Sequence, residues 1–351
     1  MSDKKRSELS DLGEFGLIDH LTRDNKLVNA SSLYGVGDDA AVIDAGDMVK
    51  LVSTDLLVEG VHFDLTYTPL KHLGYKAAIV NFSDIYAMNG TPEQITVSIA
   101  VSNRFSLEAL EEIYSGIKLA CEKYRVDMVG GDTTSSISGL FLSITVIGSA
   151  QHDEVVYRNT AKENDLICVS GDLGGAYMGL MVLEREKQVF KVNPDMQPEL
   201  QGLDYILERQ LKPEARKDVG DMLKGIGVRP TAMIDISDGL ASDIMHICKG
   251  SELGCQIFTD KLPIDAVTIN TAAEFQIDPN TAVMNGGEDY ELLFTIRQAD
   301  YEKIKNISGI SVIGHMSEAA SGMNLVTPDG KAIEIKAQGW DGLKKAPDRK
   351  K

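Results

Sequence analysis

Residues 81–90 read NFSDIYAMNG, and this stretch places an aspartate, Asp84, in the middle of an apolar helix. The helical pattern begins after Pro69, includes Leu73, and stops at Gly90. A carboxylate among core residues costs free energy unless it is paired or bound to a metal ion. A position on a solvated helix face is therefore a weaker explanation for Asp84 than a functional role.

Five further segments place an acidic residue beside glycine, serine or threonine. Carboxylate and hydroxyl oxygens in such turns, with no basic run nearby, suit hard divalent cations that hold a polyphosphate. Magnesium usually shares its octahedral ligands among one or two carboxylates, waters and substrate phosphates. The pattern predicts an ATP-using phosphotransfer enzyme. The segments are Gly37-Asp38-Asp39, Ser53-Thr54-Asp55, Gly130-Gly131-Asp132-Thr133-Thr134, Asp235-Ile236-Ser237-Asp238-Gly239 and Gly286-Gly287-Glu288-Asp289.

Most of these segments also have a purely structural explanation. Aspartate and glycine are ordinary turn residues, and Asp238 suits the N-cap of the helix that follows it. Asp235 alternates with apolar residues in a strand, which neither role explains. Because adjacent carboxylates point in different directions, we expect Asp38 rather than Asp39 to bind metal.

The composition excludes several classes of partner. Lys and Arg total 35 against 53 Asp and Glu, a formal net charge of −18, which would attract neither a nucleic acid nor an anionic membrane. The four cysteines form no CxxC pair, which is typical of a reduced protein. The polar start and the lack of a run of about 18 apolar residues predict neither a signal peptide nor a membrane span. We therefore expect a cytoplasmic protein.

The length of 351 residues predicts two domains. We expect an N-terminal metal- and ATP-binding domain at 1–150, a C-terminal domain that completes the ATP and substrate site at 151–343, and a flexible tail at 344–351. An exposed segment is expected at 187–204. Periodicity predicts helices near 15–21, 69–88, 107–124, 175–186 and 238–248, and strands at 40–43, 48–53, 93–101, 126–129, 140–147, 166–169, 232–236, 290–296 and 310–313.

Two common ATP-binding motifs are absent from the chain. No GxxxxGK[ST] segment occurs, which excludes a P-loop enzyme. A glycine-rich loop followed by the HRD and DFG motifs of protein kinases is also absent. The sequence thus predicts a phosphotransfer enzyme of another class.

Taken together, the segments GDDAA, STDLLVEGVHF, NFSDIYAMNG, GGDTT, DISDGL and GGEDYELLF resemble the thiamine-monophosphate kinase family. This family belongs to a superfamily that includes aminoimidazole ribonucleotide synthetase and selenophosphate synthetase. The resemblance runs from Gly13-Glu14-Phe15 to Gly339-Trp340-Asp341, and its strength lies in the order and spacing of the segments. It implies an α+β fold of two α/β domains of the aminoimidazole ribonucleotide synthetase-like type, paired through the N-terminal sheet in a homodimer.

The resemblance also implies an activity and a set of site residues. The activity is ATP-dependent phosphorylation of thiamine monophosphate to thiamine diphosphate, with several Mg²⁺ ions. The sequence departs from the family pattern at 158–165, where Arg158 and Lys162 are kept and the turn between them differs. The implied magnesium ligands are Asp38, Ser53, Thr54, Asp55, Asp84, Asp132, Asp235 and Asp238; the implied ATP contacts are Tyr114, Gly131, Asp132, Arg158 and Ser237; the implied substrate contacts are His62, Glu288 and Trp340, which offers an aromatic face to the thiamine rings.

The expected mechanism has no catalytic side chain. The nucleophile is a phosphate oxygen of the substrate, which is ionised near neutral pH because the second phosphate pKa lies near 6. Catalysis then consists of alignment and charge neutralisation, with direct in-line transfer. Two alternatives stay open, namely another ATP-using synthetase of the same superfamily and a non-catalytic nucleotide- or metal-binding module. A selenophosphate synthetase would need a reactive residue near its N-terminus, whereas the first cysteine here is Cys121.

Overall fold

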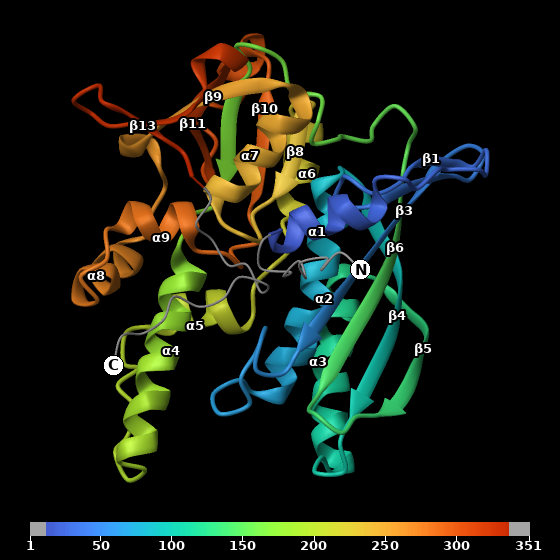
Figure 1. The fold of residues 1–351 in the computed structure, drawn as a ribbon, viewed down its shortest axis with the longest axis vertical. Helices are drawn as coiled ribbons and strands as arrows, with labels where there is room; N and C mark the ends of the chain where they lie inside the picture. Colours follow the sequence, from blue (N-terminus) through green and yellow to red (C-terminus); the bar gives the residue numbers. More distant parts are fainter. Residues whose placement is uncertain (1–11, 337–351) are drawn as a thin grey trace, which may run out of the picture.

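The computed structural model describes residues 12–336, which form two β-sheets with helices packed on them (Figure 1). Helices and strands mix in both halves, which confirms the expected α+β class. The first sheet has the order β1-β2-β3-β6-β4-β5, and the second has the order β13-β12-β9-β11-β7-β10-β8. The first comprises β1 (Ser32–Tyr34), β2 (Ala41–Asp44), β3 (Val49–Val58), β4 (Thr91–Val101), β5 (Asp127–Ser135) and β6 (Phe141–Ala150). The second comprises β7 (Leu166–Ser170), β8 (Ala232–Asp235), β9 (Leu253–Phe258), β10 (Leu292–Ile296), β11 (Ile310–Glu318), β12 (Met323–Val326) and β13 (Ala332–Glu334).

Helix α1 precedes β1, and the other helices fall in the connections between the strands. Short 3₁₀ turns occur at Thr259–Lys261, Gln298–Asp300 and Ala319–Ser321. Helices α2 and α3, of 18 residues each, confirm the expected helices at 69–88 and 107–124. The α-helices are α1 (Gly13–Thr22), α2 (Leu70–Ala87), α3 (Leu107–Tyr124), α4 (Gly175–Val192), α5 (Asp204–Leu211), α6 (Lys217–Gly225), α7 (Leu240–Ser251), α8 (Ala266–Glu274), α9 (Pro279–Asn285) and α10 (Tyr301–Ile304).

One face of the first sheet packs against α2 and α3. Leu51 and Ile144 point to this side and are buried, because successive residues of a strand alternate between the two faces. The other face, here called the open face, carries Thr54 and Leu56 of β3, Ser98 of β4 and Asp132 of β5. Leu56 is 52% exposed there. The sheet therefore offers two different surfaces to ligands and partners.

The strand expected at 126–129 runs on to Ser135, so the GGDTT segment lies inside β5 and not in a turn after a strand. It pairs in parallel with β4, where Gly131 lies opposite Val97 and Asp132 opposite Ser98. A Cβ atom on Gly131 would meet the Val97 carbonyl oxygen at 1.9 Å, so only glycine permits this approach. Because the segment consists of turn-forming residues, its sequence did not predict the edge strand that it forms.

Two other expected boundaries also differ. Helix α4 continues to Val192, because the first residue that stops it is Pro194. A further helix, α5, begins at Asp204, at the end of the segment expected to be exposed. The helix expected to start at Asp238 starts at Leu240 with Gly239 as its N-cap, so Asp238 is not the capping residue.

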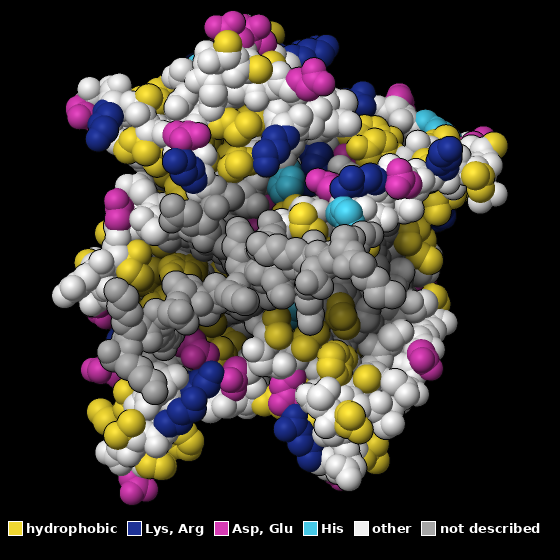
Figure 2. Space-filling model, in the orientation of Figure 1, with side chains coloured by type: hydrophobic (Ala, Val, Ile, Leu, Met, Phe, Trp, Pro, Cys, Tyr) yellow, Lys and Arg dark blue, Asp and Glu magenta, His cyan; other side chains and the backbone are white. Residues whose placement is uncertain are grey.

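Charged side chains of both signs are scattered over the face shown in Figure 2. Among the helices of residues 12–336, none combines the length and the apolar character that a bilayer crossing needs.

Candidate active site

Carboxylates from both halves of the chain meet around the C-terminal part of α2. Ser83 is fully buried, and its Oγ donates a hydrogen bond of 2.6 Å to Asp235 Oδ2 of β8. The next residue, Asp84, accepts a hydrogen bond of 2.6 Å from Ser53 Oγ of β3. The backbone N–H of Asp55 donates to Asn81 Oδ1 at 3.2 Å. Helix α2 thus joins predicted ligands of the first sheet to a predicted ligand of the second.

Burial, together with the charges of neighbouring carboxylates for some of them, raises the pKa values of this cluster. Burial raises the pKa of Asp84 well above its usual value, and the charges of Asp55, Asp235 and Asp39 raise it further. Burial likewise raises the pKa of Asp55 to about 6 and that of Asp235 to about 6. A cluster of this kind is unfavourable at neutral pH unless cations neutralise it.

Asp38 and Asp39 lie at the edge of this cluster with different partners. Asp38 is enclosed, and its carboxylate accepts hydrogen bonds from the backbone N–H groups of Asp39 at 3.0 Å and Arg158 at 3.2 Å. Asp39 Oδ2 is buried and has no hydrogen-bond partner among the described residues. Burial raises the pKa of Asp39 well above its usual value, while the nearby Arg158 charge lowers it and Asp235 raises it. Asp39, which the sequence attributed to a turn, is therefore also a candidate ligand.

Asp243 of α7 is a buried carboxylate that the sequence reasoning missed. It is 2% exposed, and its carboxylate accepts a hydrogen bond of 3.3 Å from the backbone N–H of Asp238. Burial raises its pKa well above the usual value, and the charges of Asp238 and Asp235 raise it further. Its position five residues after Asp238, among the apolar residues of the first turns of α7, was the available signal.

The predicted substrate residue Glu288 lies next to the predicted ATP residue Ser237. The backbone N–H of Glu288 donates to the Ser237 carbonyl at 2.8 Å. Glu288 is also within electrostatic range of His62: partial burial lowers the pKa of His62, and the Glu288 charge opposes that shift. Two of the three predicted substrate contacts are thus neighbours. The third, Trp340, lies outside the described residues.

Two buried side chains that the sequence reasoning missed hold Glu288. Lys76 of α2 lies 2.8 Å from Glu288 Oε1, and Gln210 Nε2 of α5 donates to Glu288 Oε2 at 2.7 Å. Lys76 was detectable as a lone charge within the apolar run of α2, whereas nothing in the sequence marked Gln210.

Four predicted residues lie apart from the carboxylate cluster. Asp132 and Gly131 are on β5, three strands away from Asp55, or about 14 Å at the usual strand spacing. The Thr54 hydroxyl hydrogen-bonds with Thr145 Oγ1 on the open face, on the opposite side of β3 from Asp55. Tyr114 lines a groove of about 670 Å³ along α3 that none of the cluster residues lines. A single chain therefore does not bring all the predicted magnesium ligands and ATP contacts into one site.

The donor chemistry of the cluster suits magnesium, although the described residues do not form a closed cage. Within residues 12–336, no three acidic, histidine or cysteine side chains converge closely enough to enclose an ion. Magnesium needs only one or two carboxylates when phosphate oxygens and waters complete its shell. The unpaired Asp39 oxygen and the hydroxyls of Ser53 and Ser83 are hard oxygen donors of the required kind. The residues therefore fit an ion that arrives with a phosphate.

Comparison with known proteins gives consistent matches over the whole chain. Residues 37–150 match the family "AIR synthase related protein, N-terminal domain". The thiamine-monophosphate kinase of Bacillus subtilis (strain 168) is 32% identical over 342 residues, which are 95% of this chain and 100% of that protein. The thiamine-monophosphate kinase of Buchnera aphidicola subsp. Schizaphis graminum (strain Sg) is 35% identical over 328 residues, which are 91% of this chain and 96% of that protein. The solved structure of AaThiL complexed with AMPPCP and TMP has a TM-score of 0.80 at 31% identity, covering 97% of this chain and 99% of that one.

Proposed function

The chain belongs to the thiamine-monophosphate kinase family, and we propose that it transfers the γ-phosphoryl group of ATP directly to the phosphate of thiamine monophosphate. The observation that carries this proposal is the carboxylate cluster around Asp84, which joins the two halves of the chain. A relative of the same fold was solved with AMPPCP, an ATP analogue, together with TMP. That pair of ligands matches the two substrates proposed here.

The main barrier to this reaction is the approach of two anions. At an effective dielectric constant of about 20, two like unit charges about 4 Å apart repel by roughly 4 kcal/mol. Bound magnesium would supply the neutralising positive charge. Several ions would be shared among the side chains of Asp38, Asp39, Ser53, Thr54, Asp55, Asp84, Asp132, Asp235 and Asp238.

The protein side chains in this proposal bind and orient the two substrates. Arg158 lies beside Asp38 and Asp39, where its guanidinium can meet an ATP phosphate. Glu288 and His62 face the second substrate, whose own ionised phosphate is the nucleophile. No general base is needed, and the mechanism contains no phosphoenzyme.

We further propose that the functional unit is a homodimer formed through the open face of the first sheet. Thr54 and Asp132 are predicted ligands on this face, and in one chain three strands separate their positions. Packing two open faces together places β5 of one chain over β3 of its partner. Asp132 of one chain then lies close to Thr54 of the other, on the shared open face.

The decisive experiment measures ADP release from ATP with and without thiamine monophosphate. We expect ADP release that depends on thiamine monophosphate and yields thiamine diphosphate in equal amount. ADP release without thiamine diphosphate would indicate another synthetase of the superfamily. Binding of ATP and magnesium with no substrate-dependent turnover would indicate a non-catalytic module, and either result would overturn the proposal.

A further inference from the structure

The loop that carries Glu288 has a strained backbone. Glu288 has φ of 68° and Tyr290 has φ of 51°, a left-handed region that residues with a side chain seldom adopt. Such a conformation costs free energy and persists only where the surroundings enforce it. The contacts that enforce this conformation therefore indicate which side chain the loop holds in place.

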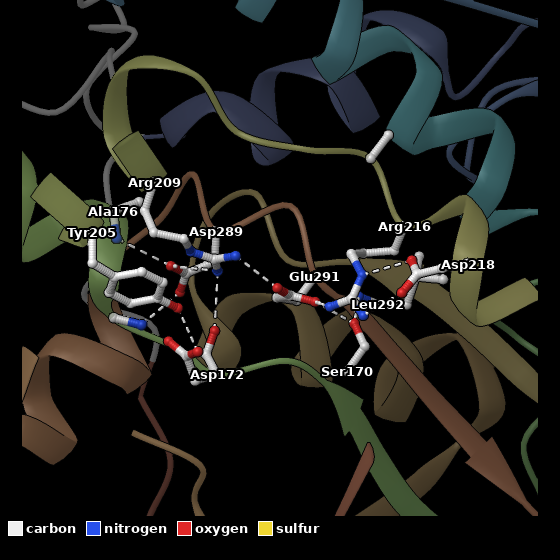
Figure 3. A network of polar contacts seen from close by, with 12 residues as sticks. Ser170, Asp172, Ala176, Tyr205, Arg209, Arg216, Asp218, Asp289, Glu291 and Leu292 are labelled. Carbon is white, nitrogen blue, oxygen red and sulfur yellow. Dashed lines mark hydrogen bonds and ion pairs between the residues drawn. The ribbon is translucent and has the colours of Figure 1, made fainter. Parts of the chain in front are cut away.

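A buried ionic network fixes the end of this loop (Figure 3). Arg209 of α5 donates to Glu291 Oε1 at 2.7 Å and lies 3.4 Å from Asp289 Oδ1. Glu291 also pairs with Arg216 and accepts a hydrogen bond from Ser170. The residues on the C-terminal side of Glu288 are therefore clamped to α5 and β7.

Asp289 anchors the same loop to another helix. Its carboxylate accepts hydrogen bonds from the backbone N–H groups of Gly174 at 2.7 Å and Ala176 at 3.3 Å, at the start of α4. The free N–H groups at a helix N-terminus favour an anion in this position. Asp289 is thus committed to a structural role, which leaves Glu288 as the acidic residue of this segment that can face a ligand.

Glu288 itself has one donor on each oxygen, as described above, and the two donors differ in kind. Lys76 is a cation whose Nζ also donates to the Gln210 carbonyl at 3.0 Å. Gln210 is neutral, so it can orient the Glu288 carboxylate without cancelling its charge. A substrate with a cationic ring would be attracted by the negative charge that remains on Glu288. A neutral donor such as Gln210 leaves that charge in place.

The side chain of Gln210 has no other described partner. It is 5% exposed, and its Oε1 is buried without a hydrogen-bond partner among the described residues. The carboxylate of Glu288 requires a donor, which fixes the amide with Nε2 toward Glu288. A glutamine kept for structural reasons would use both ends of its amide, whereas this one uses only the end that meets Glu288.

We propose that Gln210 is a positioning residue that fixes the Glu288 carboxylate for the second substrate, with Arg209 holding the loop to the same helix. This inference rests on the proposed function, since it concerns how that site selects its phosphate acceptor. Consecutive residues of α5 thus hold the Glu288 side chain and the residues that follow it. The chemical feature selected is a positively charged heterocycle that carries the acceptor phosphate.

The test replaces Gln210 with methionine, which has a similar length and no N–H donor. We expect Gln210→Met to raise the KM for thiamine monophosphate roughly tenfold, the effect of losing one hydrogen bond to a charged group. The KM for ATP and the Tm should stay close to those of the wild type. Gln210→His, which keeps an N–H donor, should recover most of the loss. Gln256→Met is the matched control, because Gln256 lies on β9 and has no described side-chain contact with Glu288.

A double-mutant cycle separates positioning from a general structural role. If Gln210 acts through Glu288, then adding Gln210→Met to Glu288→Gln changes the KM for thiamine monophosphate by less than about twofold. An equal rise in both backgrounds, or a parallel rise in the KM for ATP, would overturn the inference. Wild-type turnover is measured first: without it the proposed function fails, and this inference with it. With wild-type turnover intact, a Gln210→Met variant that behaves like Gln256→Met defeats the positioning role alone.

Discussion

Asp38 and Asp39 show how much a single position depends on its surroundings. Both occur in a segment whose composition is typical of a turn, and the sequence favoured Asp38 as the metal ligand. In the folded chain Asp38 is tied to the backbone of Arg158, while Asp39 keeps a buried oxygen without a described partner. The role of Asp38 stays a prediction, and Asp39 joins it as a candidate because only packing shows which carboxylate faces the cluster.

The carboxylate cluster predicts an unusual dependence of stability on pH. In the folded chain the pKa values of Asp55 and Asp235 are about 6, against an ordinary value of 3.8. The folded chain therefore holds these protons more tightly than the unfolded chain, so stability is lost as the pH rises through the folded pKa values. In EDTA we expect the Tm to fall by several degrees between about pH 4.5 and about pH 6.5, as scanning fluorimetry would show. Magnesium with an ATP analogue should remove most of this fall.

Asp55→Asn checks the cause of that pH dependence. In EDTA near neutral pH this variant should have a higher Tm than the wild type, because one desolvated charge is gone. Its turnover should fall by at least about 100-fold, since a ligand of the neutralising ions is lost. Asp47→Asn, in the exposed turn between β2 and β3, should change neither property. A Tm in EDTA that rises steadily from pH 4.5 to about pH 6.5 would contradict the assignment.

At the scale of elements, the junction between the Ser237 turn and the Glu288 loop depends on a close backbone approach. A Cβ atom on Gly287 would lie 2.3 Å from the Ser237 carbonyl oxygen, the acceptor of the Glu288 N–H. We expect Gly287→Ala to displace this loop, lower the free energy of unfolding by about 2 kcal/mol, and raise the KM for thiamine monophosphate. Urea denaturation and steady-state kinetics would measure the two effects.

Gly220→Ala provides the contrast for that prediction. Gly220 lies inside α6, where a Cβ atom would meet nothing within 4 Å. The same chemical change should stabilise the protein there by about 0.5–1 kcal/mol, because alanine loses less backbone freedom on helix formation. Equal destabilisation by both substitutions would show that steric crowding at Gly287 is not the reason.

Helices and strands with a clear periodic pattern were predictable from the sequence. Elements that depend on contacts with neighbouring elements were not. The patterns of α2 and α3 are long and apolar on a helical repeat, so the sequence located both. The second part of strand β5, from Gly130 on, consists of turn-forming residues and pairs only with β4, so its composition resembled a loop. Helix α5 is short and lies between α4 and the first half, and the polar residues before it concealed it.

At the scale of the whole molecule, the proposed homodimer predicts that two inactive variants regain activity when they are combined in one dimer. Thr54→Val and Asp132→Asn should each be inactive alone. If each site combines Thr54 of one chain with Asp132 of its partner, a mixed dimer of the two variants contains one intact site. Refolding the two inactive proteins together should then restore about a quarter of wild-type activity, because about half of the dimers are mixed. No recovery, with mixed dimers verified by differential tags, would place both residues in one site of one chain.

The sequence by itself determined that this chain has an α+β fold, that it resembles the thiamine-monophosphate kinases, and that residues such as Asp84 and Asp235 have a role beyond turns and caps. Those conclusions depend on local order and spacing, which the chain carries without folding. Only the tertiary structure decided which side of the sheet each predicted ligand occupies, that Asp39 and Asp243 lie beside the cluster, and that Lys76 and Gln210 hold Glu288. The physical reason is that strand register and helix packing join residues far apart in sequence, and these pairings leave no local pattern.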